Sequence, residues 1–168
     1  MKYCYNCGGL LKPEFLNQRE GMVPKCTMCG KYQFPVFSTA VSMIVLNPSQ
    51  DKILLIQQYG NTDNILVAGY ISKGENAETA AAREIKEETG LDISAVTYNK
   101  SEYFAKTNTL MINFVCIASD ADLSLIDREE VDHAEWFSFD QARKNIKHHS
   151  LAEKFLVYYL DSQQSCFQ

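Results

Sequence analysis

Two Cys-x2-Cys pairs near the amino terminus set the first limit on how this chain folds. Cys4, Cys7, Cys26 and Cys29 follow the pattern C-x2-C-x18-C-x2-C. Paired cysteines at this separation are typical of a tetrahedral zinc site, the alternative being two redox-active or incidental pairs. Residues 1 to about 33 hold little that could form a core, so bound metal would stabilise this segment. Four thiolates leave no open position for a substrate, which predicts a structural zinc ion.

The residues around the cysteines fit that interpretation. Gly8 and Gly30 each follow the second cysteine of a pair, where glycine lets the backbone turn sharply and point amides at the sulfurs. Cys116 stands in the apolar run "MINFVCIA" and is expected to be a buried small hydrophobe. Cys166 stands near the carboxyl end and is given no role.

A second unusual stretch is "REIKEETG", residues 83–90. On a helix Glu84 is a neighbour of both Glu87 and Glu88, and like charges at these spacings repel. The stretch is therefore either a solvated acidic face or a set of carboxylates whose repulsion is offset by a bound cation. Arg83 precedes Glu87 by one turn and can hold its carboxylate.

The remaining chain mixes strands and helices without strict alternation, which favours an α+β sandwich over a doubly wound sheet. Apolar periodicity and turn residues predict a hairpin from residue 38 to 59, in which "PSQD" separates the two strands. Asn76 and Gly90 are the expected ends of one helix. The other expected elements are strands at 65–70, 95–104, 110–118 and 134–139 and helices at 138–146 and 150–161.

Extended on both sides, the acidic stretch becomes "GYISKGENAETAAAREIKEETGL", residues 69–91, which resembles the Nudix box. That box is G-x5-E-x7-R-E-U-x-E-E-x-G-U, where U is aliphatic. All nine constrained positions are filled, by Gly69, Glu75, Arg83, Glu84, Ile85, Glu87, Glu88, Gly90 and Leu91. The resemblance covers about residues 38–160. It implies a Nudix-type α/β/α sandwich with a mixed sheet, and metal-dependent hydrolysis of a phosphoanhydride.

The resemblance also implies roles for the side chains. Glu84, Glu87 and Glu88 are expected to hold Mg²⁺ or Mn²⁺, which bridge phosphate oxygens and lower the pKa of a bound water. The general base varies within the family, so either Glu87 or Glu88 is a candidate here. Gly69 lets the loop before the helix approach the phosphates closely. The role of Glu75, as metal ligand or as loop support, stays open.

A cysteine ribbon followed by "LVAGYISKGE" resembles the NADH pyrophosphatase branch of the family. That branch carries a second signature, S-Q-P-W-P-F-P-x-S, where this chain has "SEYFAKTNT", residues 101–109. The three prolines are absent, but Tyr70 and Phe104 keep aromatic character at the positions that stack a base. Glu130, in "REEVDHAEWF", matches one further metal-binding carboxylate. Alternatively, Tyr70 and Phe104 are ordinary core aromatics, and Glu130 is a surface charge.

These observations predict a zinc ribbon over residues 1–34 and a Nudix hydrolase domain over residues 35–168. The expected reaction is cleavage of the pyrophosphate bond in a nucleoside diphosphate-X substrate, a dinucleotide such as NAD(H), giving mononucleotides. FAD, ADP-ribose and NAD-capped RNA ends are alternative substrates, and a non-catalytic nucleotide sensor is the alternative to an enzyme. A net charge of −5 argues against non-specific binding to nucleic acid or membranes. A cytoplasmic homodimer is expected, because the related branch is homodimeric and no apolar signal or membrane segment is present.

Overall fold

The computed structural model describes residues 2–165, with side chains as far as residue 163. Cys166 therefore lies outside the described residues. The chain divides into two compact units, Met1–Phe37 and Ser38–Gln168. No described helix has both the length and the apolar character needed to cross a membrane.

The first unit is built on one antiparallel hairpin, β1 (Leu11–Asn17) and β2 (Gly21–Cys26). Its register pairs Leu11 with Cys26, so the hairpin begins beside one of the four paired cysteines. Few of its side chains are buried, which agrees with the expectation that this segment has little core of its own.

The second unit contains one mixed six-stranded sheet in the order β6-β7-β3-β4-β8, with β5 paired to β3. Strands β3 and β7 are parallel, and the other pairs are antiparallel. The strands are β3 (Ser38–Leu46), β4 (Lys52–Gln58), β5 (Val67–Tyr70), β6 (Ile93–Phe104), β7 (Thr109–Ala118) and β8 (Val131–Ser138).

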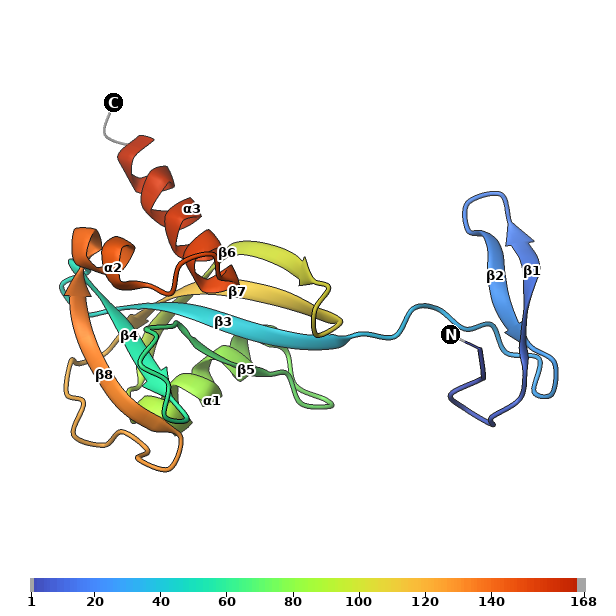
Figure 1. Ribbon diagram of the computed structural model, residues 1–168, viewed down its shortest axis with the longest axis horizontal. Coiled ribbons are helices and arrows are strands. Elements are labelled where there is room, and N and C mark those ends of the chain that lie inside the picture. Colours follow the sequence, from blue (N-terminus) through green and yellow to red (C-terminus); the bar gives the residue numbers. More distant parts are fainter. Residues whose placement is uncertain (1, 166–168) are drawn as a thin grey trace. The chain divides into compact units, whose positions relative to one another are not determined.

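The sheet departs from the simple hairpin that the sequence predicts for residues 38–59. Strands β3 and β4 are antiparallel, but only Leu46 and Ile53 are paired across them. Beyond that point β3 pairs with β5 and β4 pairs with β8, so the two strands diverge (Figure 1). This divergence separates the carboxyl end of β4 from β5, and a cleft opens between them.

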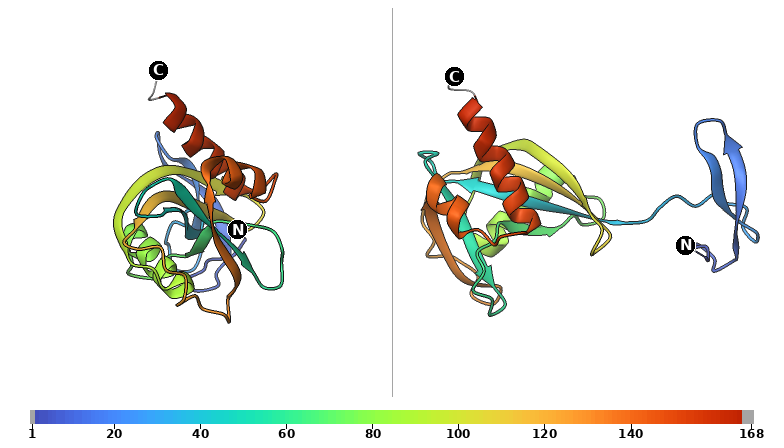
Figure 2. Two further views of the ribbon diagram at one scale, coloured as in Figure 1. Left: turned by 90° about the vertical axis from the view of Figure 1, so that its left-hand side faces the viewer. Right: turned by 45° about the horizontal axis from the view of Figure 1, so that its top comes forward.

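Side chains on alternate positions of β3 and β4 face opposite sides of the sheet. Val41, Met43 and Val45 pack with α1 (Ala77–Thr89), whereas Ile44 and Leu46 pack with α2 (Phe139–Asn145) and α3 (Leu151–Ser165). Figures 1 and 2 show α1 on one face of the sheet and the other two helices on the opposite face. The α/β/α sandwich with a mixed sheet is thus confirmed.

The helices begin where the sequence predicts them, and α1 also ends there, whereas α3 continues to Ser165, beyond the predicted end at residue 161. The side chain of Asn76 accepts a hydrogen bond from the Thr79 amide at 2.8 Å, and Gly90 is the C-cap of α1. Ser138 and Gln141 form a capping box at the start of α2, and Ser150 Oγ accepts from the Glu153 amide at 3.0 Å. Local polar side chains thus fix where each helix begins.

Candidate active site

A cleft with a volume of about 580 Å³ opens between the carboxyl end of β4, β5 and the second half of α1. It brings together most of the side chains that the sequence singles out. Those in its wall are Gly69, Tyr70, Arg83, Glu84, Glu88, Phe104 and Glu130. Glu75 and Glu87 do not line the wall, but each forms a salt bridge with Arg83, and Arg83 does line it.

Gly69 and Glu84 fit against each other at the base of this cleft. A Cβ atom added at residue 69 would overlap with the carboxylate of Glu84. Only glycine leaves room for that carboxylate beside β5. The sequence predicts that Gly69 lets the backbone approach the phosphates closely. The structure adds a second role, because Gly69 also makes space for the acidic side chain of Glu84.

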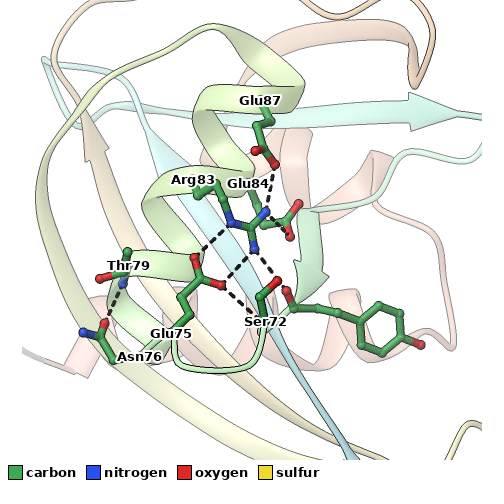
Figure 3. Close-up of polar contacts among 8 residues, drawn as sticks. Ser72, Glu75, Asn76, Thr79, Arg83, Glu84 and Glu87 are labelled. Atoms are coloured by element: carbon green, nitrogen blue, oxygen red, sulfur yellow. Dashed lines mark hydrogen bonds and ion pairs between the residues drawn. The ribbon is translucent and has the colours of Figure 1, made fainter.

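Arg83 joins the acidic side chains of the motif into one network (Figure 3). Its Nη1 atom donates to Glu84 Oε1 and to Glu87 Oε2, each at 2.8 Å. Its Nε and Nη2 atoms bond both carboxylate oxygens of Glu75 at 2.9 and 3.0 Å. The guanidinium thus offsets the repulsion between neighbouring carboxylates on α1, and its own pKa is raised by Glu75, Glu87 and Glu84.

Glu75 supports the loop that leads into α1. Its Oε2 atom accepts from the Ser72 amide at 3.1 Å in addition to the pair with Arg83 (Figure 3). The hydrogen bonds from Arg83 and Ser72 lower the pKa of this carboxyl. In this structure both Glu75 oxygens are occupied by protein donors, which favours the loop-support role among the two that the sequence leaves open.

Glu88 is the most buried acidic residue of the cleft, with 3% of its surface exposed. Its Oε2 atom is buried without a hydrogen-bond partner among the described residues. Burial, together with the charges of Glu84 and Glu130, raises the pKa of this carboxyl to about 8. A buried oxygen without a partner, in a cleft wall with two further carboxylates, is what a divalent cation would satisfy, so these side chains fit the expected Mg²⁺ or Mn²⁺.

Glu87 differs from the other acidic residues of the motif. Its side chain is 59% exposed and is held by Arg83 outside the cleft wall. Among the described residues, the four cysteines form the only group of three or more candidate ligands whose atoms all lie within 4.8 Å of one another. No three of the carboxylates of Glu84, Glu87, Glu88 and Glu130 lie that close together in this structure.

The two aromatic residues proposed to hold a base lie in the wall of this cleft. Tyr70 is 61% exposed, and Phe104 is partly buried. Neither belongs to the two buried core clusters, so the alternative interpretation of both as ordinary core aromatics does not describe their position. The cleft thus has aromatic surface and carboxylates in one wall.

The cleft wall also contains residues to which the sequence assigned no role, among them Gln58, Tyr59 and Met111. Met111 belongs to a strand that reads as ordinary sheet, and its parallel pairing with β3 brings it to the cleft. Tyr59 follows β4, and the charge of Glu130, then burial and the charges of Glu88 and Glu84, raise its pKa. No short-range sequence signal marks these positions, since each depends on long-range pairing.

The four cysteines form a second candidate site within the first unit. The Sγ atoms of Cys4 and Cys29 are 3.8 Å apart, and those of Cys7 and Cys26 are 3.5 Å apart. The amide of Asn6 donates to Cys4 Sγ at 3.3 Å, in a knuckle of the kind the sequence predicts.

The second knuckle has the same construction. The amides of Cys29 and Met28 donate to Cys26 Sγ and lower the pKa of this thiol to about 6. Gly8 and Gly30, which close the two knuckles, have φ angles of +74° and +69°, in the left-handed region that favours glycine. Four sulfurs at these distances, with amides donating to two of them, fit a zinc ion.

Comparison with known proteins places this arrangement in a family. A sequence model described as the NUDIX domain matches residues 36–159. The chain is 28% identical over 161 residues to an NAD-capped RNA hydrolase NudC of Pseudomonas aeruginosa, covering 95% of this chain and 55% of the relative. It is 32% identical over 145 residues to a protein of the same name from Haemophilus influenzae, covering 83% of this chain and 52% of the relative. The chain thus spans about half the length of these curated relatives.

Solved structures agree with the fold. A NUDIX hydrolase from Nitrosomonas europaea superimposes with a TM-score of 0.67 at 19% identity, covering 98% of this chain and 93% of that one. A UDP-X diphosphatase gives a TM-score of 0.65 at 16% identity, covering 80% of this chain and 66% of that one. Because the family model covers most of the chain and the motif residues line one cleft, this chain belongs to the NUDIX domain family.

Proposed function

We propose that this chain hydrolyses the pyrophosphate bond of a nucleoside diphosphate-X compound, a dinucleotide such as NAD(H) or the NAD cap of an RNA, giving mononucleotide ends. The observation that carries the proposal is the shared cleft, in which Tyr70 and Phe104 lie in one wall with Glu84, Glu88 and Glu130. Aromatic faces bind a nucleobase, and a carboxylate cluster holds cations against a pyrophosphate. The printed names of the NudC relatives agree with this substrate class.

The acidic residues have separate tasks in this proposal. Glu84, Glu88 and Glu130 would hold Mg²⁺ or Mn²⁺, with Glu87 as a further ligand once substrate is bound. A cation held there would supply neutralisation of phosphate charge and a lower pKa for the attacking water. Arg83 keeps Glu84 and Glu87 oriented through its two hydrogen bonds. Gly69 leaves the space in which Glu84 sits.

Glu88 is the proposed general base of the two candidates, Glu87 and Glu88. Its buried Oε2 atom is free among the described residues, whereas Glu87 Oε2 is bonded to Arg83. Without a bound cation, burial raises the pKa of this carboxyl to about 8, so Glu88 is a stronger base than an exposed carboxylate. One carboxylate oxygen of Glu88 would contact the cation, and the other would accept the proton of the water that attacks phosphorus.

The nucleobase is proposed to lie between Tyr70 and Phe104. Stacking on each aromatic face contributes about 1–3 kcal/mol per base. Such stacking tolerates adenine and nicotinamide alike, which keeps FAD and ADP-ribose among the candidate substrates. The absence of the three signature prolines loosens the loop carrying Phe104, so the reaction type is better supported than a preference for NADH.

The ribbon and the assembly complete the proposal. Cys4, Cys7, Cys26 and Cys29 bind one structural zinc ion, supported by the spacing of their Sγ atoms. The chain is proposed to act as a homodimer, as expected from the branch it resembles. Neither feature supplies a step of the reaction.

A substrate panel tests this function. NADH, NAD⁺, FAD, ADP-ribose, diadenosine polyphosphates and NAD-capped RNA are incubated with Mg²⁺ or Mn²⁺, with Glu88→Gln as the inactive control. Cleavage of a dinucleotide or cap into monophosphate ends, lost in the variant, supports the proposal. If nucleotides bind but none is cleaved, the chain is a nucleotide sensor and the proposed function is wrong.

A further inference from the structure

The turn that follows β4 has an unusual backbone for its sequence. Tyr59 and Gly60 have φ angles of +55° and +73°, and the Asn61 amide bonds the Gln58 carbonyl at 3.1 Å. Two successive positive φ angles closed by this bond define a type I′ turn, whose first central position is most often Asn, Asp or Gly. A bulky aromatic residue in the left-handed region is a strained choice there.

The strained turn is held against β8, next to a proposed cation ligand. The Gly60 amide donates to Asp132 Oδ2 at 2.7 Å, and Asp132 follows Glu130 by two residues. Gln58, at the start of the turn, pairs with Val131 in the sheet. The backbone of Tyr59 is thus anchored to the segment that carries Glu130, which fixes where its side chain emerges.

The side chain of Tyr59 has no structural task within the second unit. It is 71% exposed, and its phenol makes no hydrogen bond with the other residues that the structure describes. It nevertheless lies in the wall of the cleft, where Glu130, Glu88 and Glu84 act on its hydroxyl. Of the four described non-glycine residues with positive φ, only Tyr59 is in this wall.

We infer that Tyr59 is a substrate-binding residue whose hydroxyl donates a hydrogen bond to a phosphate oxygen of the pyrophosphate. The inference rests on the proposed function, because it assigns the cleft's carboxylate end to the pyrophosphate. Asn would occupy this position with less backbone strain than Tyr. Because the ring and hydroxyl of Tyr59 contribute little to the fold, we assign them to ligand binding. Tyr59 shares the cleft wall with Glu84, Glu88 and Glu130, and its turn is anchored two residues from Glu130, which identifies the phosphate side of the substrate as its partner.

Two variants separate the hydroxyl from the turn. Tyr59→Phe keeps the ring and the strain but removes the donor, whereas Tyr59→Asn removes the ring and installs the favoured Asn-Gly turn. Binding of inorganic pyrophosphate with Mg²⁺ is measured by calorimetry, a readout that needs no turnover. Both variants should bind it about tenfold more weakly, the effect of one hydrogen bond to a charged group.

Stability gives the second readout. Tyr59→Asn should raise the Tm by about 2–4 °C, since it relieves the left-handed strain. Gln50→Asn is the matched control, because Gln50 also has positive φ, +57°, but lies in the distant β3–β4 turn. It should gain stability without any change in pyrophosphate affinity.

The outcomes are distinct from those of the substrate panel. Unchanged pyrophosphate affinity in Tyr59→Phe, or no pyrophosphate binding by the wild type, overturns the assignment of the hydroxyl. Weaker NADH binding with unchanged pyrophosphate binding also overturns it, because the ring would then contact a nucleoside. If pyrophosphate binding weakens as expected while no panel substrate is cleaved, the proposed hydrolysis fails and the role of Tyr59 in phosphate binding stands.

Discussion

The carboxylate of Glu84 occupies the space that a Cβ atom of residue 69 would fill. Glycine at residue 69 therefore leaves the Glu84 carboxylate its place beside β5. The two residues belong to one sequence motif and stand fifteen positions apart. Their contact gives a physical reason why that motif needs glycine at residue 69 and accommodates glutamate at residue 84.

Gly69→Ala should displace Glu84 and lower both stability and activity. The expected cost in the free energy of unfolding is about 1 kcal/mol, at the low end for overpacking, because the displaced atoms are the far end of a flexible side chain. In a Glu84→Ala background the added methyl has room, so the same substitution should cost little there. Urea denaturation of the wild type, the two single variants and the double variant measures the coupling. If Gly69→Ala lowers the free energy of unfolding equally in both backgrounds, the methyl group and the Glu84 carboxylate do not collide.

Glu75→Gln should loosen the loop before α1 and reduce turnover. The amide keeps one acceptor oxygen for Arg83 but loses the second and the negative charge, and charge-assisted hydrogen bonds contribute about 1.5–3 kcal/mol each. We expect kcat to fall about tenfold or more, because Arg83 also orients Glu84. Arg83→Lys should behave similarly, since an ammonium does not replace the guanidinium fork. Additive effects in the double variant, measured by steady-state kinetics, would contradict a shared network.

Glu88 should make stability fall as the pH rises, when no Mg²⁺ or Mn²⁺ is added. Burial raises the pKa of its carboxyl from 4.5 to about 8, so the folded protein keeps a proton that the unfolded chain releases. The free energy of unfolding is then expected to decline between about pH 4.5 and pH 8 and to level off above.

Glu88→Gln provides the control for that profile, because an amide has no proton to lose. The variant should lack this decline and should be more stable than the wild type above pH 8. Chemical denaturation across the pH range, without divalent cations, measures both profiles. Parallel profiles for the two proteins would show that Glu88 is not the group responsible.

Removal of zinc should unfold the first unit and leave the second folded. Residues 1–37 bury few apolar side chains, so bound metal supplies much of their stability. One zinc ion per chain is expected in metal analysis, and a chelator should make cleavage by proteases selective for this segment. A Cys7→Ser variant should show the same cleavage without chelator. Absence of zinc, or unchanged protease resistance, would contradict the assignment.

The sequence predicted those parts of the fold that short-range chemistry decides. Asn76 and Gly90 bound α1 because a cap side chain and a terminal glycine act within one turn of the helix. The Nudix box likewise placed Gly69, Glu84 and Glu88 in one cleft, since strand β5 and the helix that follows it carry them.

Long-range pairing decided what the sequence did not show. The predicted hairpin of β3 and β4 opens after one residue pair, because β3 has β5 and β7 as its main partners. The ribbon strands β1 and β2 carry no alternating apolar pattern, as they have no sheet face to bury. The left-handed backbone of Tyr59 had no sequence signal, since its residue type is not one that favours it.

The most direct measurement is kcat/KM for NADH with Mg²⁺, with the products identified chromatographically, for the wild type, Glu88→Gln and Glu87→Gln. The account predicts cleavage into AMP and reduced nicotinamide mononucleotide. Glu88→Gln should reduce kcat/KM by about 10²–10⁴-fold, the usual contribution of a general base, and Glu87→Gln by less. Failure of the wild type to cleave NADH or any other dinucleotide, or full activity in Glu88→Gln, would contradict it.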